Sequence, residues 1–110
     1  MQYLAEALAR VIEERVLGTL HIAAADSCSK YEFGLKLARA FDLDTTVFTP
    51  ALVATATQLV ARPKNMTLAS KATAAALNWA MPTVDQSISR YAELERIGYQ
   101  TMLRAAFNPA

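Results

Sequence analysis

Arg62, Lys64 and Asn65 are the residues of this chain whose types and spacing best suit the binding of a phosphate group. A guanidinium group presents a two-pronged set of donors that matches phosphate oxygens, and a nearby lysine and asparagine add a cation and an amide donor. Pro63 directs the residue before it into extended backbone, so Arg62 is expected on an extended arm. An equally consistent alternative is that Arg62 pairs with a carboxylate or a helix C-terminus inside the fold.

The other reactive side chains form no recognisable catalytic set. His21 has no serine, cysteine or aspartate at a spacing that indicates a triad, and one histidine with one cysteine cannot make a Cys/His metal site. We expect His21 to be a half-buried side chain of a strand and Cys28 to be unreactive. Trp79 and Met81 are expected to fill the core rather than to stack on a ligand. The sequence therefore predicts no catalytic residue and no metal ligand.

The first half of the chain predicts the order helix, strand, helix, strand. Apolar residues recur at helical spacing over 2–17, and Gly18 is expected to end that helix. β-branched and apolar residues predict short strands at 19–24 and 45–49, where both sheet faces could be covered. The helix between them, over 29–41, begins with a Ser-x-x-Glu capping box.

The second half predicts helices alone. Residues 51–61 mix helix formers with β-branched residues and predict one or two helical turns. A short helix is expected over 70–78, with the serine at its start as the cap, and a longer one over 83–97 after a Thr-x-x-Gln capping box. Gly98 is a C-terminal signal, and apolar spacing predicts one more helix over 99–107.

Together these elements predict a small, mostly helical α/β domain. Two short parallel strands would be joined by one right-handed crossover and covered by four or five helices. Two strands cannot cover the apolar faces of 2–17, 51–61 and 99–107, so exposed apolar surface is expected to mark a partner site.

The order of several short motifs resembles the C-terminal part of the dTDP-4-dehydrorhamnose reductase family, within the extended short-chain dehydrogenases. The resemblance covers about residues 3–90. The motifs are GTLHIAA at 18–24, SKYEFGLKLARAF at 29–41, Arg62-Pro63, Leu68, Ser70-Lys71, Leu77 and Met81-Pro82. Two positions depart from the family pattern: Ala69 stands where such proteins usually have aspartate, and Asn78 where they usually have glycine.

The resemblance implies a nucleotide-sugar-binding domain at 1–98, with a helical extension at 99–110. The family reduces a dTDP-4-dehydro-6-deoxysugar with NADPH or NADH, in dTDP-rhamnose biosynthesis, and binds the dinucleotide in a Rossmann half. No glycine-rich turn for a pyrophosphate is present here, so this chain is expected to bind no cofactor and to need that half in cis or in trans. Tyr31 and Lys36 cannot replace the family's Tyr-x-x-x-Lys pair, because five residues place them roughly 140° apart around a helix.

The methionine adenosyltransferase regulatory subunit has a similar C-terminal part, which makes a non-catalytic regulatory or interaction module the alternative function. Composition argues against two further classes of function, nucleic-acid binding and membrane spanning. The net charge of +1, without a basic cluster, argues against nucleic-acid binding, and no stretch approaches the ~20 apolar residues of a membrane span. The lone cysteine fits a cytoplasmic protein, and a homo-oligomer is consistent with the apolar faces.

Overall fold

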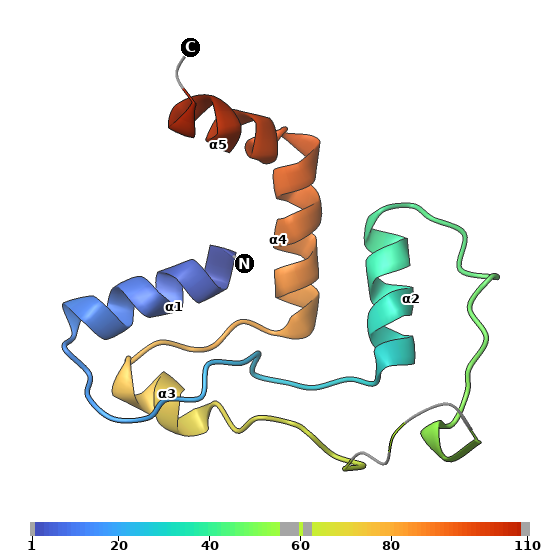
Figure 1. The fold of residues 1–110 in the computed structure, drawn as a ribbon, viewed down its shortest axis with the longest axis horizontal. Helices are drawn as coiled ribbons and strands as arrows, with labels where there is room; N and C mark the ends of the chain where they lie inside the picture. Colours follow the sequence, from blue (N-terminus) through green and yellow to red (C-terminus); the bar gives the residue numbers. More distant parts are fainter. Residues whose placement is uncertain (1, 56–59, 61–62, 109–110) are drawn as a thin grey trace.

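The computed structural model describes residues 2–55, 60 and 63–108, and over these ranges the chain is an open arrangement of five α-helices. In chain order the elements are α1 (Gln2–Glu13), α2 (Lys30–Ala40), the 3₁₀ turn η1 (Val53–Thr55), α3 (Lys71–Ala76), α4 (Val84–Arg96) and α5 (Tyr99–Phe107). α2 lies beside α4, and α5 crosses the C-terminal end of α4 (Figure 1). α1 and α3 lie on the other side of α4 from α2.

Both predicted capping boxes are present. The Ser29 hydroxyl accepts a hydrogen bond from the Glu32 amide at 3.1 Å, and the Glu32 carboxylate accepts one from the Ser29 amide at 2.8 Å. Thr83 and Gln86 make the same two bonds at the start of α4, at 3.1 and 2.8 Å. Each box satisfies two backbone donors that a helix start would otherwise leave without a partner, which explains why α2 and α4 begin where the sequence predicts.

The two predicted strands are wrong, and no strand occurs in the part of the chain that the structure describes. Residues 19–24 have no regular secondary structure. The Thr73 hydroxyl donates to the His21 carbonyl at 2.8 Å, and the Ser70 hydroxyl donates to the Ala24 carbonyl at 3.2 Å. A strand needs a neighbouring backbone along its length. Here two carbonyls of the segment 19–24 accept hydrogen bonds from side chains of the α3 region instead.

The second predicted strand, 45–49, is a turn. The Asp44 carboxylate accepts hydrogen bonds from the Thr46 amide at 2.8 Å and the Thr46 hydroxyl at 2.7 Å, an aspartate turn that competes with extended backbone. The turn carries the Phe48 ring onto α2 at Gly34, where a Cβ atom would lie 2.8 Å from the ring. The domain is therefore mostly helical as predicted, but the parallel strands and their crossover are not found.

Two further local predictions need correction. Ser70 does precede α3, but its side chain makes no capping bond because its hydroxyl is turned toward Ala24. The His21 side chain is exposed rather than half-buried, and the residue contributes its carbonyl to the fold. Of the predicted turns within 51–61, η1 is present, while 56–59 and 61 lie outside the described residues.

The first helix is shorter than predicted, because α1 ends at Glu13 rather than near residue 17. Arg15 adopts the left-handed conformation, with φ of 51°. The Val16 amide then bonds back to the Val11 carbonyl at 3.1 Å, and the Arg15 amide to Ile12 at 3.2 Å. These are the two bonds of a Schellman motif, which completes the helix before Gly18 is reached.

A left-handed residue follows both α1 and α4, and substitutions at these two positions are predicted to have opposite effects. Arg15→Gly should raise the free energy of unfolding by about 0.5–1 kcal/mol, because glycine adopts a positive φ without strain. Gly98→Ala should lower it by about 1 kcal/mol; Gly98 has φ of 67°, and an added Cβ would meet nothing within 4 Å, so the cost is backbone strain alone. Urea unfolding measures both. Arg15→Ala is the control, and a gain there equal to that of Arg15→Gly would contradict the explanation.

The core is small and is built largely from alanines and a few long side chains. Buried apolar residues among those described are Ala7, Ala38, Leu77, Met81, Ile88 and Ala92. Ala38 on α2 and Ala92 on α4 allow these two helices to approach closely. Met81 is buried as predicted, whereas Trp79 is only half-buried, with the Arg10 guanidinium 4.8 Å from its ring.

The chain exposes far more surface than a compact domain of its size. Its accessible surface is 9096 Å², whereas a folded monomer of 12.0 kDa is expected to expose about 6,000 Å². The radius of gyration is 17.4 Å, against about 13 Å for a compact domain of this length. The five helices therefore leave much apolar surface without a partner inside the chain.

Candidate functional site

The phosphate-binding candidates lie on the segment that leads into α3. Arg62 falls outside the described residues. Lys64 and Asn65 are exposed, and the Asn65 side-chain oxygen accepts a hydrogen bond from the Thr67 amide at 3.0 Å. This short turn follows the exposed Lys64, and the role of these residues in phosphate binding stays a prediction.

A cleft lies elsewhere, lined by residues of α1, α4 and α5 and of the segments 22–24 and 81–82. This cleft has a volume of about 820 Å³, within the range of ~300–1,000 Å³ that is usual for ligand sites. Its walls are mainly apolar and include Tyr3, Leu4, Ala23, Met81, Leu94 and Leu103. Sequence reasoning did not locate this cleft, although it did indicate that the apolar face of the first helix would lack a partner within the chain.

The charged groups at the cleft are mostly acidic. Glu6, Arg90 and Glu95 line it. The Arg90 guanidinium is paired with Glu93 at 2.7 Å, and this hydrogen bond is the main cause that raises the Arg90 pKa above its ordinary value. The Glu95 carboxylate accepts a hydrogen bond from the side-chain amide of Gln100 at 3.1 Å. The Arg90 charge is partly balanced by Glu93, and Glu6 and Glu95 add two carboxylates to the lining, so the cleft suits a phosphate group less well than a cationic or neutral one.

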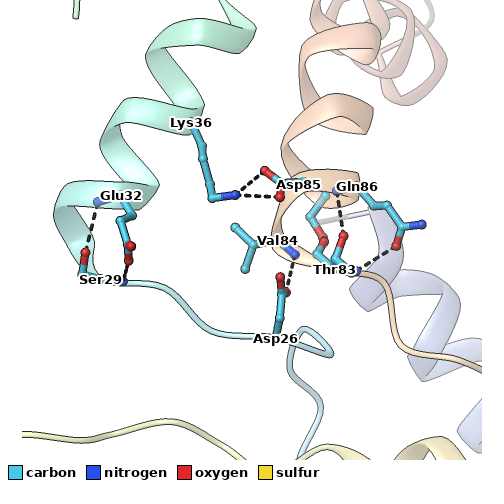
Figure 2. Close-up of polar contacts among 9 residues, drawn as sticks. Asp26, Ser29, Glu32, Lys36, Thr83, Val84, Asp85 and Gln86 are labelled. Carbon is cyan, nitrogen blue, oxygen red and sulfur yellow. Dashed lines mark hydrogen bonds and ion pairs between the residues drawn. The ribbon is translucent and has the colours of Figure 1, made fainter.

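A polar junction links the middle of α2 and the segment before this helix to the N-terminal end of α4 (Figure 2). The Lys36 ammonium contacts both carboxylate oxygens of Asp85 at 2.6 Å. The Asp26 carboxylate accepts a hydrogen bond from the Val84 amide at 2.7 Å, at the first residue of α4. The hydrogen bond to Asp85 is the main cause that raises the Lys36 pKa, because it favours the charged ammonium.

The ion pair with Asp85 gives Lys36 a structural role that does not involve catalysis. Its partner Asp85 is 49 residues away in the sequence, so no local pattern indicated the pair. Tyr31 lies on the same helix, with 36% of its surface accessible to solvent. Glu32, one turn before Lys36, has its pKa lowered mainly by the backbone and hydroxyl hydrogen bonds of Ser29, because these bonds favour the charged carboxylate.

No three histidine, cysteine, aspartate or glutamate side chains in the described ranges come together as a metal ion would require. No helix in the same ranges has the length and apolar character needed to cross a bilayer.

The fold and these surfaces define the class of protein as a small, open helical domain whose packing is incomplete within the chain. The chain belongs to the RmlD substrate binding domain family: the family model matches residues 1–96, which takes in α1 to α4 and excludes α5. Searches of curated proteins and of solved structures give no match. The family assignment agrees with the resemblance found in the sequence, whereas the division of the chain at residue 98 stays a prediction.

Proposed function

We propose that this chain is the nucleotide-sugar-binding part of a dTDP-4-dehydrorhamnose reductase-like enzyme. The observation that carries the proposal is the family match over residues 1–96. The substrate would be a dTDP-4-dehydro-6-deoxysugar, and NADPH or NADH would be held by a Rossmann half that is supplied in cis or in trans. In this arrangement the chain contributes binding and orientation, and hydride transfer to the keto carbon takes place where the dinucleotide is bound.

Arg62, Lys64 and Asn65 are the residues that we propose for contact with the diphosphate. Support comes from the contrast between the two candidate surfaces. The cleft between α1, α4 and α5 carries the carboxylates of Glu6 and Glu95, whereas the segment before α3 exposes the cation of Lys64. A diphosphate is attracted more to the second surface than to the first.

The open packing supports a role as one part of a larger active site. About 3,000 Å² of surface is exposed beyond the area expected for a compact monomer. On α1, Leu8 is 48% exposed and Ile12 is 76% exposed. Contacts between domains within one protein typically bury ~600–1,500 Å², so a Rossmann half could cover this helix and bring the dinucleotide to the substrate.

Calorimetric titration tests the proposal with a dTDP-sugar and with NADPH, each added separately to the 110-residue chain. We expect heat of binding for the dTDP-sugar and none for NADPH. Lys64→Ala and Arg62→Ala should each weaken dTDP-sugar binding by about tenfold, because each removes a charged donor to the diphosphate. Lys71→Ala is the matched control, since Lys71 is also exposed and begins α3. Dinucleotide binding without a response to the dTDP-sugar would overturn the assignment, and so would an equal loss in the control.

The exposed apolar faces favour the alternative function, a non-catalytic regulatory or interaction module like the one at the end of the methionine adenosyltransferase regulatory subunit. Such a module would bind neither ligand in the titration and would associate with another protein through α1 or α5. A strictly monomeric chain that binds no hydrophobic dye would exclude it.

A further inference from the structure

The backbone of residues 19–24 has few hydrogen-bond partners among the described residues. None of its amides donates to an acceptor there, and of its carbonyls only those of His21 and Ala24 accept a hydrogen bond. Leu20 and Ile22 use neither their amide nor their carbonyl within these ranges, although both residues are half-buried. Folded proteins supply partners to nearly all backbone groups that are shielded from water, so the segment has the backbone of an element that pairs with a further chain segment.

The sequence and the dihedral angles of the segment suit an added strand. The apolar Leu20 and Ile22 are half-buried, while Thr19 and His21 between and before them are exposed. This alternation is the pattern of a strand that has one covered face. None of the residues 19–24 has a positive φ, so no left-handed residue opposes an extended conformation.

One edge of the segment is held by α3 and the other edge is free. The segment runs from the end of α1 past α3, where the Thr73 hydroxyl donates to the His21 carbonyl at 2.8 Å (Figure 1). In extended backbone the amide and carbonyl of one residue point to the same edge, and those of the next residue point to the opposite edge. The free groups of Leu20 and Ile22 therefore belong to one edge, opposite the edge that His21 presents to α3.

The cleft gives an added strand room beside this segment. Ile22, Ala23 and Ala24 line the cleft of about 820 Å³, whose walls are mainly apolar. A helix seated there would use its backbone groups internally and would leave the amides of the segment without acceptors. An extended chain satisfies these amides and places alternate side chains against the apolar walls, so it is the occupant that the cleft and the backbone both favour.

We propose that the segment 19–24 pairs, through the backbone of Leu20 and Ile22, with an edge strand of the Rossmann half. A Rossmann half is built around a parallel sheet, and an edge strand of such a sheet carries a row of free donors and acceptors. Residues of α1 line the same cleft as 22–24, so one partner reaches both surfaces. The pairing rests on the proposed function for the identity of this partner, because that function requires a Rossmann half.

A strand peptide tests the pairing separately from substrate binding. The probe is an acetylated peptide of alternating threonine and valine with lysines at its end, added to the full chain and followed by amide hydrogen exchange. Main-chain hydrogen bonds supply the affinity in strand addition, so a generic sequence is sufficient. We expect exchange of the Leu20 and Ile22 amides to slow about tenfold at a peptide concentration of roughly ten times its Kd, and the His21 amide to change little.

The matched control is the same peptide with every backbone amide N-methylated. It keeps the side chains but has no backbone donor, and its methyl groups block both edges, so it should leave the exchange of Leu20 and Ile22 unchanged. Equal slowing by both peptides would overturn the pairing, because apolar contact alone would then account for the protection. No slowing by the unmodified peptide at millimolar concentration would also overturn it.

Two further outcomes separate the partner from the pairing. Slow exchange of Leu20 and Ile22 that appears without peptide and increases with the concentration of the chain would assign the edge to a second copy and reject the Rossmann half. A dTDP-sugar titration without heat, beside a normal response to the peptide, would reject the proposed function and with it the Rossmann half as partner. A normal dTDP-sugar titration without a response to the peptide would reject the pairing and leave the proposed function in place.

Discussion

Leu77→Ala is expected to lower the free energy of unfolding by about 2–5 kcal/mol, the range typical for truncating a buried leucine. Leu77 is only 3% exposed and follows α3 directly. Its amide donates to the Thr73 carbonyl at 3.0 Å, so the residue closes α3 while its side chain fills the core. Few buried side chains surround Leu77 among the described residues, so little can shift to fill the cavity that alanine would leave. We therefore expect a loss of stability near the upper part of this range.

Leu17→Ala is the matched control for this prediction, because Leu17 is 91% exposed. The same chemical change there should shift stability by less than about 0.5 kcal/mol. Urea unfolding followed by circular dichroism gives both values, and Leu77→Ala is expected to reduce the midpoint without a large change in slope. If the two variants were equally stable, the buried position of Leu77 would be refuted.

Thr73→Val should cost about 1–3 kcal/mol, although it keeps the size and branching of the side chain. Thr73 is 1% exposed, and its hydroxyl donates to the His21 carbonyl at 2.8 Å. Valine cannot donate this bond, so the His21 carbonyl loses its protein partner at a part-buried contact. The bond also links α3 to the segment 19–24, so amide exchange in that segment should become faster.

Thr73→Ser separates the hydrogen bond from packing. Serine keeps the hydroxyl and removes one methyl group, which costs about 1 kcal/mol at a buried position. Hydrogen exchange at 19–24 should then stay close to that of the wild type, unlike the exchange expected for Thr73→Val. Faster exchange in the serine variant as well would show that the methyl group, rather than the hydroxyl, holds this segment.

Helix starts were the most predictable features of the fold. The Ser29–Glu32 and Thr83–Gln86 boxes were read correctly because every bond in them joins residues three apart. Helix ends were less predictable, since α1 stops at a left-handed Arg15, a residue type that carries no such signal. Asn78, after α3, also adopts a left-handed conformation, with φ of 43°.

The candidate site was predictable only in part. The sequence indicated an extended arm at Arg62 with Lys64 and Asn65 beside it, because a proline acts on the backbone of the residue before it. Arg62 lies outside the described residues, so this site stays a prediction. It did not indicate the cleft, which forms where α1, α4 and α5 meet. Nor did it indicate the Lys36–Asp85 pair, whose members become neighbours only when α2 packs beside α4.

What this sequence determined by itself was the set of helices, the points where two of them begin, and membership of the RmlD substrate binding domain family over residues 1–96. These depend on bonds between near neighbours and on the order of short motifs. The tertiary structure alone decided the fate of segments 19–24 and 45–49. Both segments have the composition of strands, but a strand forms only where another backbone lies alongside it. In the described chain the Ser70 and Thr73 hydroxyls bind carbonyls of the first segment, and an aspartate turn occupies the start of the second.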